Sequence, residues 1–252
     1  MSEPHEFQDH FSGVAASYAA SRPAYPPELY AFVARSAPAT QRAWDCATGN
    51  GQAAVGLSEY FDEVHGTDAS PQQIENAMPR PNISYSVQLS ENTVFADDHF
   101  DAVTIAQALH WFDLDKFASE LSRVLRPAGV TVAWTYGFFN VEERIDEIVR
   151  AYFFEPIEPF WPEESELAWS GYSGLELPFA PIDTPEFDLT FRWNLTELIG
   201  YLSTWSALNR YIEQHGSGLI GQLTERMAAV WVDPDQKRTI DMDFYVRAWR
   251  NV

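Results

Sequence analysis

A stretch of small residues that follows a short apolar segment constrains this fold more than any other feature. The stretch R-A-W-D-C-A-T-G-N-G-Q-A-A runs from Arg42 to Ala54 and contains Gly49 and Gly51. Its apolar start is typical of a buried parallel strand, and the two glycines are typical of a tight turn that leads into a helix near Gln52. Because no bulky side chain covers such a turn, a nucleotide-like ligand can approach the backbone closely. The stretch therefore predicts a cofactor site at the end of a strand.

Strand-like and helix-like segments alternate after this turn, which predicts an α/β fold with a parallel sheet and helices on both faces. Strands are predicted over 43–46, 63–68, 83–87, 100–105, 130–136 and 187–193. Helices are predicted over 7–20, 28–35, 52–60, 71–78, 114–125, 142–154, 195–202 and 219–231. Apolar and polar residues alternate from Ile240 to Ala248, which predicts a half-exposed strand at an antiparallel edge of the sheet.

The composition restricts the classes of partner. The 252 residues are 46% hydrophobic and 15% aromatic, which is typical of a single folded domain. Acidic residues number 37 against 16 basic ones, so the net charge of −21 disfavours nucleic acid and anionic membranes as partners. The N-terminus has no secretory signal pattern and no long apolar run occurs, so we expect a cytoplasmic protein, monomeric or weakly homodimeric.

No metal site is predicted. Cys46 is the only cysteine, which excludes an intramolecular disulfide and a cysteine-rich metal site. The histidines His65, His99 and His215 stand apart without the spacing of a metal-binding motif. Metal dependence is therefore not expected.

The glycine turn alone leaves the cofactor open. Gly49 to Ala54 matches G-x-G-x-x-A, a dinucleotide-binding pattern, whereas Asp45 to Gly51 is close to the D-x-G-x-G-x-G pattern of S-adenosylmethionine (SAM) sites. A plain strand-to-helix turn is a third interpretation. Asp68 ends the next predicted strand, where a carboxylate can accept hydrogen bonds from both ribose hydroxyls of either cofactor. The alternative is a carboxylate that backbone N–H groups satisfy at a helix N-terminus.

Further motifs favour SAM. They are F-x-x-x-A-x-x-Y-x-x-x-R-P-x-Y-P over 11–26, I-A-Q-A-L-H-W-F-D over 105–113, L-S-R-V-L-R-P-A-G over 121–129 and G-Y-L-S-T-W-S-A over 200–207. With them, nearly the whole chain resembles the class I SAM-dependent methyltransferases, and within these the small-molecule group that includes the trans-aconitate methyltransferases.

The resemblance implies a Rossmann-like fold with a seven-stranded, mostly parallel sheet and an antiparallel edge. It also implies one methyltransferase domain over 1–252 with four parts, namely an N-terminal helical lid over 1–40, a SAM-binding core over 41–136, an insertion or acceptor cap over 137–186, and final strands and helices over 187–252.

The resemblance also implies which residues contact SAM and its product S-adenosylhomocysteine (SAH). The turn from Asp45 to Gly51 would face the methionine moiety and ribose, Asp68 the ribose hydroxyls and Ala69 the adenine. Ser90 and Glu91 would also contact adenine. The full set of implied cofactor contacts is Tyr18, Arg22, Asp45, Ala47, Thr48, Gly49, Gly51, Asp68, Ala69, Ser90, Glu91, Gln107, His110 and Trp111.

Two positions depart from the family pattern. Ala47 stands where the first glycine is usual, and Ala128 stands where a second glycine often follows the proline. Because an added methyl group is small, we expect a slightly tighter turn without loss of cofactor binding.

The chemistry of SAM needs little from the protein beyond placing an acceptor in line with the activated methyl group. A carboxylate acceptor needs no base, whereas for a phenol or amine His110 is the candidate base, because the ordinary pKa of histidine lies near neutrality. The alternative is a histidine that hydrogen-bonds the cofactor or backbone and moves no proton. Aromatic candidates for the acceptor pocket, about a third of which we expect to serve it, are Trp161, Trp169, Tyr172, Phe179, Trp205 and Tyr211.

The sequence therefore predicts SAM-dependent methyl transfer to a small-molecule acceptor, at a carboxylate or hydroxyl oxygen, by in-line displacement. One alternative is an NAD(P)-dependent oxidoreductase that uses the same glycine turn. Another is a non-catalytic SAM-binding protein with a regulatory or scaffold role.

Overall fold

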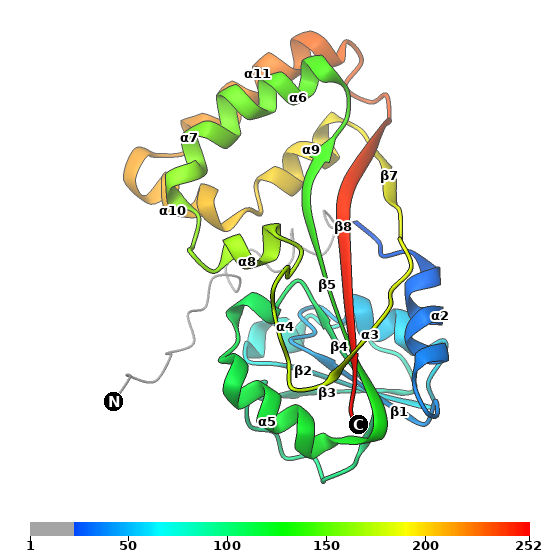
Figure 1. The fold of residues 1–252 in the computed structure, drawn as a ribbon. Coiled ribbons are helices and arrows are strands. Elements are labelled where there is room, and N and C mark those ends of the chain that lie inside the picture. The colour runs from blue at the N-terminus through cyan, green and yellow to red at the C-terminus, as the bar shows by residue number, and fades with distance from the viewer. Residues whose placement is uncertain (1–22) are drawn as a thin grey trace.

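One twisted sheet connects a lower α/β layer to an upper helical layer in the computed structural model, which describes residues 23–252 (Figure 1). Its strands are β1 (Arg42–Cys46), β2 (Glu63–Asp68), β3 (Ile83–Val87), β4 (Phe100–Ala106), β5 (Leu125–Asn140), β6 (Ala180–Ile182), β7 (Leu189–Trp193) and β8 (Arg238–Arg250). Within the described chain seven strands follow the order β3-β2-β1-β4-β5-β8-β6, and β7 pairs with β8 outside this path.

The pairing directions confirm the predicted sheet. The strands from β3 to β5 pair in parallel, and β8 pairs antiparallel with β5, β6 and β7. The antiparallel edge therefore holds the short strands β6 and β7 as well as the predicted C-terminal strand.

Helices cover both faces of the lower sheet, as predicted. They are α2 (Pro27–Ser36), α3 (Gln52–Leu57), α4 (Pro71–Glu75) and α5 (Leu114–Val124). Ala43 and Trp44 follow each other in β1 but belong to different hydrophobic clusters, because successive side chains of a strand point to opposite faces. Ala43 packs in the cluster that contains α2 and α3, and Trp44 packs in the cluster that contains α5.

Several predicted helix starts are confirmed by their caps. Asp113 accepts a hydrogen bond from the N–H of Lys116 and caps α5, and Ser70 caps α4, in which Pro71 is the first residue. The helix α9 (Leu195–Leu202) begins with a capping box. The predicted helices 52–60 and 71–78 are too long, since α3 ends at Leu57 and α4 at Glu75.

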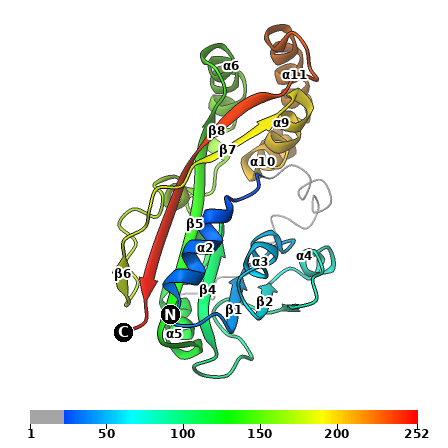
Figure 2. The same cartoon turned by 90° about the vertical axis from the view of Figure 1, so that its right-hand side faces the viewer.

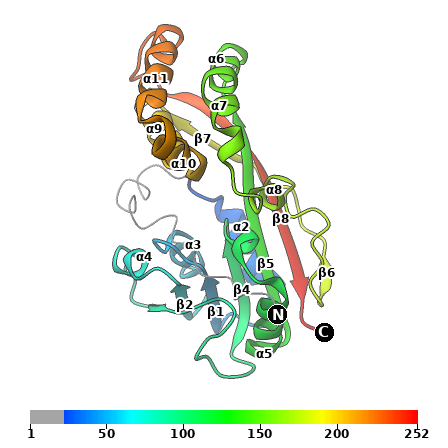
Figure 3. The same ribbon diagram turned by 90° about the vertical axis from the view of Figure 1, so that its left-hand side faces the viewer.

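The upper layer, which we call the helical cap, consists of helices from two parts of the chain. Those after β5 are α6 (Glu143–Val149), the π-helix η3 (Arg150–Phe154), α7 (Glu155–Ile157) and the 3-10 helix η4 (Glu158–Phe160). Those after β7 are α9, α10 (Ser206–His215) and α11 (Gly218–Trp231). Figure 3 shows α9, α10 and α11 beside α6 and α7, and one hydrophobic cluster joins both groups. The cap was predicted only within residues 137–186. It also includes α9, α10 and α11, which lie in the part predicted as final strands and helices.

The long strands β5 and β8 run from the lower layer into the cap (Figure 2). The prediction that the fifth strand ends at Tyr136 is wrong, because β5 continues to Asn140 through a shift in its register with β8 between Tyr136 and Phe139. The short helix α8 (Ser165–Trp169) lies between the two layers and contacts β5. In the predicted lid, α2 packs on the sheet, whereas Tyr18, Arg22 and the predicted helix 7–20 lie outside the described residues.

Candidate functional site

The carboxyl ends of β1 to β4 meet at one edge of the sheet. From β1 the chain runs to β2 and β3 on one side, and it then crosses back to β4 and β5 on the other side. Such a switch point is where open α/β sheets bind ligands. The topology brings together the described residues that the sequence implicated, namely Ala47, Thr48, Gly49 and Gly51 after β1, Asp68 and Ala69 at the end of β2, Ser90 and Glu91 after β3, and Gln107, His110 and Trp111 at the end of β4.

Asp45 holds the glycine turn from inside the protein. It is fully buried, and its carboxylate accepts hydrogen bonds from the hydroxyls of Thr48 at 2.5 Å and Thr104 at 2.9 Å. Burial raises the pKa of Asp45 to about 6. The N–H of Thr48 donates to the carbonyl of Thr67, which fixes the turn against β2. Direct contact between Asp45 and the cofactor stays a prediction.

Asp68 connects β2 to the turn. One carboxylate oxygen accepts the N–H of Gly49 and the other accepts the N–H of Ser70, each at 2.9 Å. The alternative interpretation from the sequence, a carboxylate bound by backbone N–H groups, therefore describes part of its role. A carboxylate oxygen has two lone pairs and can accept more than one hydrogen bond, so a ribose role beside these bonds stays a prediction.

The two glycines of the turn face different surroundings. A methyl group at Gly51 would lie 2.1 Å from the hydroxyl oxygen of Tyr85. Among the residues that the structure describes, one at Gly49 would meet only Gln73 Oε1, at 3.9 Å. The space beside Gly49 is therefore open to a ligand. Gln73 Oε1 is buried and has no hydrogen-bond partner within residues 23–252, which adds an acceptor at the turn that no sequence motif indicated. An adenosyl group with its ribose hydroxyls fits these surroundings.

The segments after β3 and at the end of β4 have their own anchors. Glu91 accepts the N–H of Asp113 at 3.1 Å and ties the segment after β3 to the start of α5. Ser90 and Ala69 are half-buried beside this edge. Gln107 adopts a left-handed conformation with φ of 56°, and its side-chain oxygen accepts the hydroxyl of Thr135 at 2.7 Å.

His110 lies in the short 3-10 helix η2 (Leu109–Trp111). Its Nδ1 is 3.4 Å from the hydroxyl of Tyr172. Burial lowers the pKa of His110 to about 4, so the ring is neutral at physiological pH. The ordinary histidine pKa, on which the sequence argument for a base relied, therefore does not apply here.

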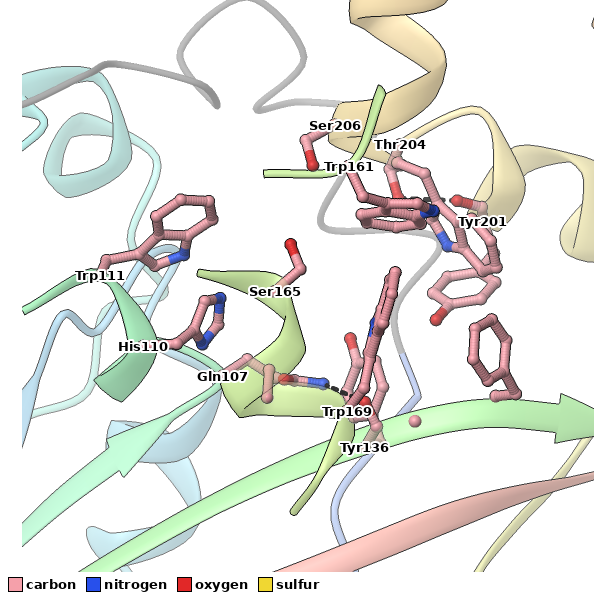
Figure 4. A pocket seen from close by; sticks show the side chains of 14 residues that line it. Gln107, His110, Trp111, Tyr136, Trp161, Ser165, Trp169, Tyr201, Thr204 and Ser206 are labelled. Carbon is pink, nitrogen blue, oxygen red and sulfur yellow. Dashed lines mark hydrogen bonds between the residues drawn. The ribbon is translucent and has the colours of Figure 1, made fainter. Parts of the chain in front are cut away.

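A cavity of about 100 Å³ lies between this edge and the cap (Figure 4). Its lining consists of Gln107, His110, Trp111, Tyr136, Gly137, Phe138, Trp161, Ser165, Ala168, Trp169, Tyr201, Thr204, Trp205 and Ser206. Three of the six aromatic candidates, Trp161, Trp169 and Trp205, line it. The other three do not, because Tyr172 and Phe179 are buried in the cluster beneath α5 and Tyr211 packs on Phe160.

The cavity is uncharged over its described lining, which contains no lysine, arginine, aspartate or glutamate. The histidine in this lining is His110, which is neutral because burial lowers its pKa. A carboxylate placed among the three indoles would lack a cationic partner from these residues, and an unpaired buried charge is costly.

Two absences hold for residues 23–252. No group of three or more His, Cys, Asp or Glu side chains there could hold a metal ion. None of the helices described is at once long and apolar enough to cross a membrane.

Comparisons with known proteins agree with the fold. Residues 44–133 match a family model described as a methyltransferase domain. A protein of Dictyostelium discoideum named as a methyltransferase is 29% identical over 96% of this chain and 94% of its own length. A solved structure from Anaeromyxobacter dehalogenans, named as a type II methyltransferase, is 35% identical, covers 92% of this chain and 98% of that chain, and has a TM-score of 0.84. Together with the sheet order and the site, these similarities show that the chain belongs to the class I SAM-dependent methyltransferases.

Proposed function

We propose that this protein transfers the methyl group of SAM to a hydroxyl oxygen of a small molecule. The observation that carries this proposal is the aromatic cavity beside Gln107, His110 and Trp111, whose described lining has no charged side chain. Of the two oxygen acceptors that the sequence left open, carboxylate and hydroxyl, the lining favours the hydroxyl because a neutral group enters it without an unpaired charge.

The residues divide the work between cofactor and acceptor. SAM supplies an electrophilic methyl group when bound. Asp68 and the turn around Gly49 would hold its adenosine, and the aromatic walls of the cavity would hold the acceptor and exclude water. His110, neutral at physiological pH, would accept a hydrogen bond from the acceptor hydroxyl and so turn an oxygen lone pair toward the methyl group. It would take up the hydroxyl proton as the new oxygen–methyl bond forms.

Isotope-labelled SAM tests the proposal. The protein is incubated with labelled SAM and matched pairs of small hydroxyl and carboxyl compounds, and label is expected in methyl ethers of the hydroxyl compounds. Label in methyl esters alone would contradict the hydroxyl assignment. Tight SAH binding without any labelled product would support the non-catalytic alternative, and calorimetric binding of NADH but not SAH would support the oxidoreductase alternative.

The finer expectations belong to the same proposal. We propose a cytoplasmic protein that acts as a monomer or weak homodimer. We also propose that it has no nucleic-acid or membrane partners, and the net charge of −21 supports this part. Light scattering tests the oligomeric state. Membership of the trans-aconitate group stays a prediction, and trans-aconitate belongs in the acceptor panel as the carboxylate case.

A further inference from the structure

Ser165 is a buried residue whose hydroxyl faces the cavity. Its relative exposure is 5%, it lines the cavity, and its Oγ makes no hydrogen bond with any described residue. Figure 4 shows this hydroxyl pointing into the space between Trp111 and Trp161, with His110 nearby. Because this hydroxyl is reached from the cavity, a ligand that enters can replace water as its hydrogen-bond partner.

Two nearby hydroxyls differ from that of Ser165 because they donate to backbone carbonyls. Thr204 in the same lining donates to the carbonyl of Tyr201 at 2.7 Å. Ser170, at the other end of α8, donates to the carbonyl of Leu167 at 2.9 Å. Ser165 is therefore a hydroxyl at the cavity wall that remains able to bind an acceptor molecule.

The surrounding walls are suited to an aromatic ring. Trp161 packs edge-on against Trp169, with ring centroids 4.9 Å apart, and at 5.3 Å from Trp205. A further aromatic ring gains about 0.5–1.5 kcal/mol beyond its buried area in such surroundings. The volume of about 100 Å³ is of the order of one six-membered ring, since a dry protein cavity of roughly 150 Å³ binds benzene.

We propose that the acceptor is a neutral hydroxyarene and that Ser165 is the residue that positions its hydroxyl. The ring lies among Trp161, Trp169 and Trp205, and Ser165 donates a hydrogen bond to one lone pair of the hydroxyl oxygen. The hydroxyl proton points to His110, which leaves the second lone pair for the incoming methyl group. His110 accepts this proton as the oxygen–methyl bond forms. This inference rests on the proposed function, because it names the substrate class of the same site.

Calorimetry on the full-length protein saturated with SAH tests it with four probes, namely phenol, toluene, cyclohexanol and benzoate. We expect phenol to bind most tightly. Ser165→Ala is expected to weaken phenol binding about threefold to tenfold and to leave toluene binding unchanged, because a single neutral hydrogen bond is lost. Ser165→Thr keeps a hydroxyl and is expected to retain the preference for phenol, and Ser170→Ala is the control from the same helix.

Each other outcome has a defined meaning. The role of Ser165 would be overturned if Ser165→Ala preferred phenol over toluene as strongly as wild type does. The substrate class would be overturned if cyclohexanol or benzoate bound as tightly as phenol. Should Ser165→Ala not fold, Ser165→Cys replaces it as a nearly isosteric variant with a weak donor. If phenol binding depends on Ser165 but labelled SAM gives no methyl ethers, the proposed function fails and this recognition role stands.

Discussion

The carboxylate of Asp68, at the end of β2, accepts a hydrogen bond of 2.9 Å from the backbone N–H of Gly49 in the turn after β1. This bond joins two neighbouring strand ends at the cofactor edge, so the residue expected to bind ribose also fixes the shape of the turn. Its removal is therefore expected to affect both binding and local order.

Asp68→Ala is expected to weaken SAH binding by about 1–3 kcal/mol, because ribose hydroxyls and the Gly49 N–H would lose their acceptor. Isothermal titration calorimetry measures the effect. Asp62→Ala, an exposed carboxylate just before the same strand, is the control and should bind SAH as wild type does. Unchanged affinity in Asp68→Ala would refute the ribose role.

Gly51→Ala is expected to destabilise the protein by about 2–5 kcal/mol in urea denaturation. The left-handed φ of 83° is unfavourable for alanine, and its methyl group would lie 2.1 Å from the Tyr85 hydroxyl. Gly174→Ala is a matched control, since φ there is 76° and nothing lies within 4 Å. Gly174→Ala should lower the free energy of unfolding only by the backbone strain of alanine in this conformation, about 1–2 kcal/mol. Equal losses in the two variants would show that the contact with Tyr85 is unimportant.

Ala128→Gly is expected to raise the free energy of unfolding by up to about 1 kcal/mol. Ala128 has a left-handed φ of 63° and is exposed, so glycine relieves strain without loss of packing. Ala47, the other family glycine position, has φ of 54° but packs partly against the core, so Ala47→Gly should gain less. Ala229→Gly, on the exposed side of α11, should instead lose about 0.5–1 kcal/mol. Destabilisation by Ala128→Gly would contradict this account.

His110 should make the fold less stable in acid. Its pKa in the folded protein is about 4, below the roughly 6.5 of an unfolded chain. Between these values the unfolded state takes up a proton that the folded state does not, so stability is lost as pH falls through this window and is unaffected above it. The free energy of unfolding of His110→Gln, relative to that of wild type, is expected to be about 1–2 kcal/mol higher at pH 5 than at pH 7.5. Urea denaturation at the two pH values measures this difference. A gain independent of pH would argue against a buried neutral ring.

The same pKa predicts how activity depends on pH. Because His110 stays neutral above about pH 5, its titration should cause no inflection of kcat/KM near pH 6.5. Any inflection near this pH in the wild type should therefore also be present in His110→Gln. A pH–rate profile of both proteins checks this. Such an inflection, present only in wild type, would identify His110 as a base that titrates near neutrality.

Much of the parallel part of the sheet could be predicted because most of its strands are short and separated by clear turn residues. The segments 63–68 and 83–87 match β2 and β3 to the residue. Gly137 led to a wrong end for β5, since a glycine often marks a turn but here lies at an irregularity where the strand bends and pairing resumes at Phe139. The helix α10 was not predicted at all.

The cofactor edge was accessible from the sequence because its residues directly follow strands, and parallel strands end at one edge. The acceptor cavity could not be predicted from the sequence in this way. Ser165 lies in a polar, acidic stretch, and only the packing of α8 between the two layers brings its hydroxyl to the cavity. The lowered pKa of His110 likewise depends on burial by neighbours distant in the chain.

The two long strands β5 and β8 continue from the lower layer into the cap, paired from Val130 with Arg250 to Asn140 with Asp241. Hinged domain closure needs a few residues free to change their backbone angles, and a paired ribbon offers few of them. The walls of the acceptor cavity should therefore keep their spacing as the chemistry proceeds. A ligand that matches this spacing binds a surface already in place, and little of its binding energy is spent on ordering the protein.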